Sequence, residues 1–279
     1  MMMILLQSDE NYTWLAPYGY AIVFAGILFF FFRAFEIWYA NTYNRPLFRH
    51  YLVYKKLSKT QAKILSLEFS FYKLLSEKHK RQFRHRIAVF MAEKKFVGRE
   101  GLEVTERMKV LIASVACMLS FGRKNFEYGL IEHILVYPDE FYSAANEAYH
   151  KGEFNPRGRA LVLSWKDFEE GYRITDDKRN LGIHEFMHAM QLEAKQSRDT
   201  DSSRLMAQFQ NILKKLTQTE VREKLEKTQF FRNYAFTNQY EFMAVLAEYF
   251  IESPKEFKSH FPEIYDHTQK LLNFRFAGY

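Results

Sequence analysis

The sequence predicts an α+β fold that is mainly helical and is preceded by one transmembrane helix. Three observations support this fold class: an uncharged apolar run near the N-terminus, a few short strand patterns in the middle of the chain, and helical periodicity from Thr175 nearly to the end. The chain has 279 residues, of which 48% are hydrophobic. About 240 residues remain after the apolar run, which is enough for one domain with a sizeable core.

The apolar run predicts a membrane anchor. Residues 11–32 carry no charge, and a helix over about residues 14–34 is long enough to cross a hydrocarbon core of roughly 30 Å. Cleavage as a signal peptide is disfavoured because residues 1–32 contain no lysine or arginine and residues 29–32 are all phenylalanine. A buried core helix is the alternative, but the phenylalanine run leaves no polar face.

The charges that flank the run predict its orientation. Two acids precede it, Asp9 and Glu10, and five basic residues follow it, namely Arg33, Arg45, Arg49, Lys55 and Lys56. Because positively charged flanks stay on the cytoplasmic side, we expect residues 1–43 to form a single-pass anchor in the cell membrane. Residues 44–279 are then one cytoplasmic domain.

The composition of the chain excludes an internal disulfide and a multi-thiolate zinc site, and it argues against a nucleic-acid partner. The single cysteine, Cys117, cannot form an internal disulfide or a multi-thiolate zinc site, and it lies in the apolar run VLIASVACML. Lysine and arginine outnumber the acids 40 to 33, giving a net charge of +7. This moderate excess is not typical of a dedicated nucleic-acid-binding protein, so we expect no nucleic-acid partner.

The first part of the domain is predicted to contain three helices. Ser58 is a suitable N-cap for the first, and a second is expected over Ser76–Phe96. The basic residues of the second helix either contact anionic lipid headgroups or form a solvated face. After a break at Gly98–Gly101, GLEVT is predicted to be a short strand, and RMKVLIASVACMLSFG a buried helix that ends at Gly122.

Two strands and a helical C-terminal half complete the expected fold. EHILVYP is a strand that ends at proline, residues 149–159 are a loop rich in glycine and proline, and ALVLSW (residues 160–165) is a strand. ALVLSW is either a core strand or a free sheet edge that could pair with an extended peptide. The later helices are expected to break near residues 199–203, 232–237 and 253–254.

The octet IHEFMHAM contains a possible metal-binding motif. On a helix, His184 and His188 project from one face and can converge on one ion, and Glu185 lies beside them. This is the H-E-x-x-H pattern, in which two neutral imidazoles bind zinc and the glutamate is the general base. The surrounding residues are uncharged, which favours a buried helix. The alternative is a helix with two ordinary histidines.

A catalytic zinc site needs a third protein ligand, and residues 191–198 supply no histidine. The helix predicted in YAFTNQYEFMAVLAEYF carries Glu241 and Glu248, which are seven residues apart and share one face. Either carboxylate could therefore reach the ion. Glu241 could instead close a capping box with Asn238.

From Phe90 to about Phe274 the chain resembles the Mlc titration factor A family of zinc-dependent peptidases. Its metal motifs also resemble the catalytic domain of anthrax lethal factor. The matching stretches are FMAEKKFVGREGLEVTERMKVLIASVACML, ILVYPDEF, VLSWKDF, IHEFMH, YAFTNQYEFMAVLAEYF and FPEIY. The resemblance implies a zincin-like metallopeptidase domain.

The resemblance also implies roles for individual residues. It implies that His184, His188 and Glu241 hold one Zn²⁺ ion, that Glu185 is the base, and that Tyr234 faces the site. Tyr234 would hydrogen-bond the oxyanion that forms during peptide hydrolysis; the alternative is an aromatic side chain packed at the start of a helix.

Some residues depart from the related patterns. Where lethal factor has a second acid four residues after its ligand glutamate, this chain has Val245. Glu248 resembles an acid of the titration-factor pattern and either orients a histidine or lies on the helix surface. The sequence after the histidine helix, AMQLEAKQSRDTDS, also differs from the family, so the neighbouring pocket wall is expected to differ.

These features predict a membrane-anchored zinc metallopeptidase that hydrolyses a peptide or protein substrate with a zinc-activated water and Glu185 as base. An alternative function is an anchored binding protein that sequesters a cytoplasmic regulator, as the resemblance to a titration factor implies. An inactive zinc-binding scaffold is a third possibility, although every catalytic residue type is present.

Overall fold

The computed structural model describes residues 15–43, 53–143, 147–174 and 177–279. By the contacts within the chain, it divides into two units, Met1–Leu47 and Phe48–Tyr279, which are described separately.

The first unit contains one long helix, α1 (Ala16–Tyr43). Its apolar part, Ala16–Tyr39, has 24 residues and a mean hydropathy of 1.9, and its large apolar side chains are exposed. At 1.5 Å per residue this part is about 36 Å long, enough to cross a membrane. Four of the flanking charges used to predict the orientation, Asp9, Glu10, Arg45 and Arg49, lie outside the described residues.

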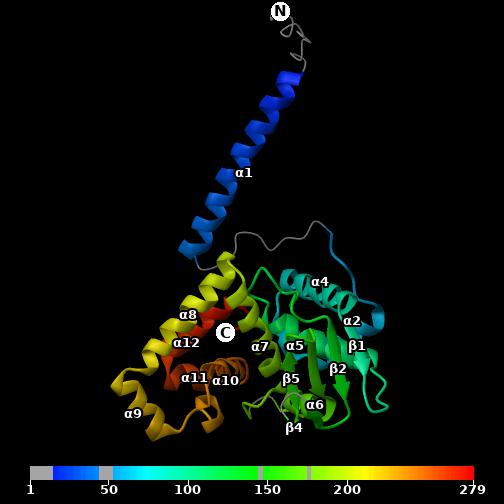
Figure 1. Cartoon of the computed structure of the whole chain (residues 1–279), viewed down its shortest axis with the longest axis vertical. Helices are drawn as coiled ribbons and strands as arrows, with labels where there is room; N and C mark the ends of the chain where they lie inside the picture. Colours follow the sequence, from blue (N-terminus) through cyan, green and yellow to red (C-terminus); the bar gives the residue numbers. More distant parts are fainter. Residues whose placement is uncertain (1–14, 44–52, 144–146, 175–176) are drawn as a thin grey trace, which may run out of the picture. The chain divides into compact units, whose positions relative to one another are not determined.

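The second unit contains a four-stranded sheet with the order β1-β2-β6-β5 (Figure 1). Strands β1 (Lys95–Gly98), β2 (His133–Tyr137) and β6 (Ala160–Ser164) are parallel, and β5 (Gly152–Asn155) runs antiparallel to β6. A separate antiparallel pair is formed by β3 (Phe141–Ser143) and β4 (Ala148–His150). The outer strands of the larger sheet are therefore β1 and β5.

Two strand predictions are corrected by this topology. GLEVT is not a strand, because the chain turns there: Leu102 N–H donates to Arg99 O, and Gly101 has a φ of +80°. The strand is the preceding segment, β1. ALVLSW forms β6 as expected, but it has no free edge, because part of the predicted loop folds back as β5 and pairs with it.

The first helices of the unit pack around the sheet. They are α2 (Lys59–Glu68), α3 (Ser70–Leu74), α4 (Glu77–Glu93), α5 (Glu106–Leu119) and α6 (Trp165–Arg173). Ser58 caps α2 as predicted, accepting a hydrogen bond from Gln61 N–H. The basic run of α4 does not form one face, because Arg86 is buried. Helix α5 is buried along most of its length, as its apolar sequence predicts.

The C-terminal half is helical. It contains α7 (Leu181–Gln196), α8 (Thr200–Leu216), α9 (Thr219–Thr228), the 3₁₀ helix η2 (Asn233–Phe236), α10 (Gln239–Glu252), α11 (Pro254–His260) and α12 (Pro262–Leu272). Figure 1 shows α7 between the strands and the helices α8, α10 and α12. Helix α7 contacts α5, α8, α10, β5 and β6. Its position at the centre of the unit explains why its sequence is apolar around most of its circumference.

Candidate metal centre

The helix that carries the H-E-x-x-H motif is α7, and Asn180 fixes its start. The Asn180 side-chain oxygen accepts a hydrogen bond from Ile183 N–H at 3.0 Å, so the first turn is capped although it is buried. His184 and His188 follow on one face, with their ring centroids 4.7 Å apart. The expected juxtaposition of the two imidazoles is present in the structure.

The carboxylate of Glu241 reaches both imidazoles from α10. Its Oε2 lies 2.9 Å from His184 Nε2, and its Oε1 lies 3.4 Å from His188 Nε2. Asn238 caps α10 by accepting hydrogen bonds from Tyr240 N–H and Glu241 N–H. The Glu241 side chain is turned to the histidines, so the reciprocal bond of a capping box is not formed.

These three side chains have the donor chemistry and spacing of a metal site. One ligand atom from each of His184, His188 and Glu241 lies within 4.8 Å of the others. Two atoms that each lie about 2.0–2.1 Å from a tetrahedral ion are about 3.3–3.4 Å apart. The separation of Glu241 Oε1 from His188 Nε2, 3.4 Å, has this value, and that of Oε2 from His184 Nε2, 2.9 Å, is shorter. Two imidazoles and one carboxylate suit zinc and leave a fourth position open.

Glu248 holds the other nitrogen of His184. Its carboxylate is 1% exposed, and Oε1 lies 2.7 Å from His184 Nδ1. This contact fixes the ring orientation and directs Nε2 toward Glu241. The sequence left two positions open for Glu248, on the helix surface or against a histidine. The structure places it against His184.

Arg232 is a site residue that the sequence analysis missed. Its guanidinium donates to both oxygens of Glu248, at 2.7 and 2.9 Å, and to Lys178 O at 2.6 Å. The backbone N–H of Asn180 also donates to Glu248, at 3.0 Å. Two sequence signals could have identified these residues: a lone charge in the aromatic run QFFRNYAF, and an asparagine just before the apolar helix.

The electrostatics of the centre follow from these contacts. Burial alone would lower the pKa of His184, but hydrogen bonds to Glu241 and Glu248 outweigh it and raise that pKa to about 10. Burial also opposes ionisation of Glu241, yet the two histidines hold its pKa well below the ordinary value. The metal-free centre therefore favours an ionised Glu241 carboxylate beside a protonated His184.

Glu185 follows His184 on α7, and its side chain contacts the outer strand β5. Its side chain is buried, which raises its pKa, and the backbone of Phe154 hydrogen-bonds to it. At Gly152 a Cβ atom would lie 2.8 Å from Glu185 Oε1 and 2.7 Å from a methyl carbon of Leu181. Only glycine at position 152 lets β5 approach the carboxylate this closely.

Tyr234 lies at the open side of the centre, in η2. Its ring centroid is 5.9 Å from that of His184, and the side chain is 51% exposed. Partial burial and the nearby Glu241 raise the pKa of its phenol to about 12. The hydroxyl is therefore protonated at neutral pH and can donate a hydrogen bond.

Comparison with known protein families identifies the family to which the chain belongs. The profile of the family described as glucose-regulated metallo-peptidase M90 matches residues 45–273. The chain belongs to the M90 family. Membership establishes a metallopeptidase-type domain with a zincin-like fold, as expected from the sequence, and implies a metal ion. In the M90 chain, the helix with both histidines and the helix with Glu241 lie inside the matched range.

Individual relatives cover most of the same region. A protein of Synechocystis sp. is 27% identical over 225 residues, covering 74% of this chain and 81% of the relative. Mlc titration factor A of Serratia proteamaculans is 27% identical over 224 residues, covering 71% and 82% of the two chains. Mlc titration factor A of Yersinia pestis is 24% identical over 235 residues, covering 76% and 86%. The resemblance stated from the sequence is therefore confirmed.

Replacing Arg232 with Gln should weaken zinc binding by the M90 chain about 10–100-fold, because the buried Glu248 loses both charged hydrogen bonds and no longer fixes His184. Competition with a chromophoric chelator measures this affinity. Arg179→Gln, at an exposed arginine beside the helix cap, is the matched control. Equal zinc affinity in the two variants would contradict the orienting role of Arg232.

Zinc binding should strengthen as the pH rises from neutral toward 10. With a pKa of about 10, His184 is protonated at neutral pH in the metal-free protein, whereas zinc binds the neutral imidazole. Binding near neutral pH should therefore release about one proton from His184. Titration calorimetry in buffers of different ionisation enthalpy measures the release. Affinity that is independent of pH in this range would disagree with the raised pKa.

Proposed function

We propose that this chain is a membrane-anchored zinc metallopeptidase, with its anchor in residues 1–43 and its catalytic domain in residues 44–279. The observation that carries the proposal is the convergence of His184, His188 and Glu241, with the buried carboxylate of Glu185 beside them. Two neutral imidazoles and one carboxylate are a ligand set of hydrolytic zinc sites. We propose zinc as the metal for the same reason.

The proposed reaction is hydrolysis of a peptide bond. When bound, zinc would polarise the scissile carbonyl and make a water molecule more acidic. Glu185 takes a proton from the attacking water and later passes it to the leaving amine, and its raised pKa suits both transfers. The Tyr234 hydroxyl donates a hydrogen bond to the oxygen on which negative charge develops.

An extended substrate would lie along β5. This strand is at the edge of the sheet, and its backbone contacts Glu185 through Phe154. Pairing of a peptide with the free side of β5 would place main-chain amides beside the base without requiring a particular side chain. We therefore propose that β5, and not ALVLSW, is the strand that pairs with an extended peptide.

The proposed location is the cytoplasmic side of the cell membrane. The length and apolar composition of α1 support the anchor, and the basic residues after it support the orientation.

A second candidate function is capture of a regulatory protein. The relatives from Serratia proteamaculans and Yersinia pestis carry the name Mlc titration factor A, which favours this function for the present chain as well. Binding of a purified Mlc protein to the full chain, measured with and without a zinc chelator, separates the two functions. Capture that survives chelation would place the binding surface away from the metal, and it can coexist with hydrolysis.

Replacing Glu185 with Gln should abolish peptide hydrolysis and leave zinc bound. The amide cannot accept the proton from water, whereas the three proposed ligands are unchanged. A fluorogenic peptide library measures cleavage, and elemental analysis measures zinc. Glu170→Gln, at an exposed acid of α6, is the control that should retain full activity. Wild-type rates in Glu185→Gln would rule out the proposed base.

Replacing Gly152 with Ala should lower the hydrolysis rate at least about 10-fold, because the added methyl group would lie 2.8 Å from Glu185 Oε1 and displace the carboxylate. Zinc content should stay at the wild-type level. Gly158→Ala is the matched control from the same hairpin, where an added Cβ meets only ordinary contacts at 3.5 Å or more. If both variants cleave peptides equally well, β5 does not position the base.

A further inference from the structure

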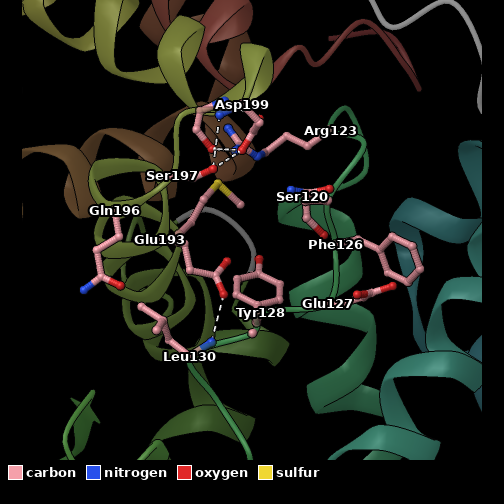
Figure 2. A pocket seen from close by; sticks show the side chains of 14 residues that line it. Ser120, Arg123, Phe126, Glu127, Tyr128, Leu130, Glu193, Gln196, Ser197 and Asp199 are labelled. Atoms are coloured by element: carbon pink, nitrogen blue, oxygen red, sulfur yellow. Dashed lines mark hydrogen bonds between the residues drawn. The ribbon is translucent and has the colours of Figure 1, made fainter. Parts of the chain in front are cut away.

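A cavity of about 380 Å³ lies at the end of α7 away from its cap. Its walls are the loop of residues 120–130, the last two turns of α7 and the start of α8. Neither the histidines of α7 nor Glu241 line it. The volume falls in the range of small-molecule sites, about 300–1,000 Å³. Figure 2 shows Ser197, Asp199 and Arg123 close together, and Glu193 apart from them near Leu130.

Two buried basic side chains hold the loop of residues 120–130 by hydrogen bonds to its backbone. They are Arg86 in α4 and Lys94 at the C-terminal end of α4. Arg86 donates to Ser120 O at 3.0 Å and to Arg123 O at 2.8 Å. Lys94 donates to Tyr128 O at 3.0 Å and also to Ile131 O at 2.7 Å. These hydrogen bonds to four carbonyls fix the position of the loop relative to α7. The cavity is therefore preformed and does not require a ligand to open it.

One end of the cavity presents a buried guanidinium. Arg123 is 5% exposed, and the one hydrogen bond of its side chain among the described residues is a long one, 3.4 Å to Ser202 Oγ. A guanidinium has five N–H donors, and a buried charge needs more than one weak partner. The nearby Asp199 already accepts three hydrogen bonds from Ser197 and Ser202. Arg123 therefore retains donors for an anionic group.

The other end presents a carboxylate. Glu193 accepts a hydrogen bond from Leu130 N–H at 2.9 Å through Oε1, and the backbone of Gly129 also hydrogen-bonds to its carboxylate. Burial raises the pKa of Glu193 in spite of the Leu130 amide and the charges of Arg123 and Lys94. An additional cation beside it would stabilise the ionised form. Figure 2 shows Glu193 directed toward Leu130 and Tyr128, apart from the Arg123 end.

Apolar side chains line the cavity beside Glu193. They are Met190 and Tyr128, each 3% exposed, whereas the Phe126 ring stacks on Arg86. The Tyr128 hydroxyl is occupied by a hydrogen bond to Ala116 O, so the phenol offers mainly its ring to the cavity. An aliphatic side chain would fit this region and remove apolar surface from water.

We propose that this cavity binds a free amino acid with an apolar side chain, with its carboxylate on Arg123 and its ammonium group on Glu193. Four charged residues line the cavity. Asp199 is already bonded to Ser197 and Ser202, and Glu127 is exposed, which leaves Arg123 and Glu193 to bind the two charges of a zwitterion. Met190 and Tyr128 favour an aliphatic side chain such as that of leucine.

The cavity shares α7 with the metal centre. Met190, Glu193 and Gln196 line it from the same helix that carries His184, Glu185 and His188. Hydrolysis of a terminal peptide bond releases a free amino acid, so such a product could bind here and act on the helix of the base. This regulatory role rests on the proposed function, whereas binding itself does not.

The test is titration calorimetry on the full chain in detergent micelles after zinc removal with a chelator. L-leucine is the probe, and its methyl ester and N-acetyl derivatives lack the carboxylate and the ammonium charge respectively. L-leucine should bind, and each derivative should bind at least about 10-fold more weakly, a difference of about 1.4 kcal/mol. Because zinc is absent, these results do not depend on peptidase activity. No binding of L-leucine, or equal binding of all three compounds, would overturn the proposal.

Two variants assign the binding to this cavity. Arg123→Gln removes the charge and keeps a donor for Ser202, and Glu193→Gln removes the charge and keeps an acceptor for Leu130. Each should weaken L-leucine binding at least about 10-fold, while Arg179→Gln should bind as the wild type does. Wild-type affinity in both cavity variants would show that L-leucine binds elsewhere and would overturn the assignment.

Discussion

The buried carboxylate of Glu248 joins the three segments on which the metal centre depends. It accepts hydrogen bonds from Asn180 at the start of α7, from Arg232 ahead of η2, and contacts His184. A carboxylate that is 1% exposed is stable only when its charge is compensated. Loss of one partner of a buried ion pair costs about 3–5 kcal/mol. The position of the His184 ring is thus set by the same interaction that keeps the helices together.

The rest of the centre is arranged around that fixed imidazole. Glu241 bridges the two histidines from α10, and Glu185, next to His184 on α7, contacts β5. The proposed base therefore lies between the proposed ligands and the strand proposed to hold substrate. The cavity near Glu193 uses the next turns of the same helix.

The sequence predicted the parts of this arrangement that depend on local spacing. His184 and His188 come together because one helical turn separates them. Spacing could not choose between Glu241 and Glu248, since both lie on one face of α10, and only tertiary packing places the first at both histidines and the second behind His184. Arg232 was missed because its partner is sixteen residues away across a turn. The edge strand was misplaced because a four-residue strand, GEFN, resembles a loop until it pairs with β6.

We propose that two imidazoles and one carboxylate hold a single zinc ion. X-ray absorption at the zinc edge of the full chain identifies the ligand atoms. We expect one zinc per chain with two imidazole nitrogens and oxygen ligands, all at about 2.0–2.2 Å, and no sulfur. The sole cysteine, Cys117, is buried in α5 and should not contribute. A sulfur ligand, a third imidazole, or a chain that retains no zinc would rule out this ligand set.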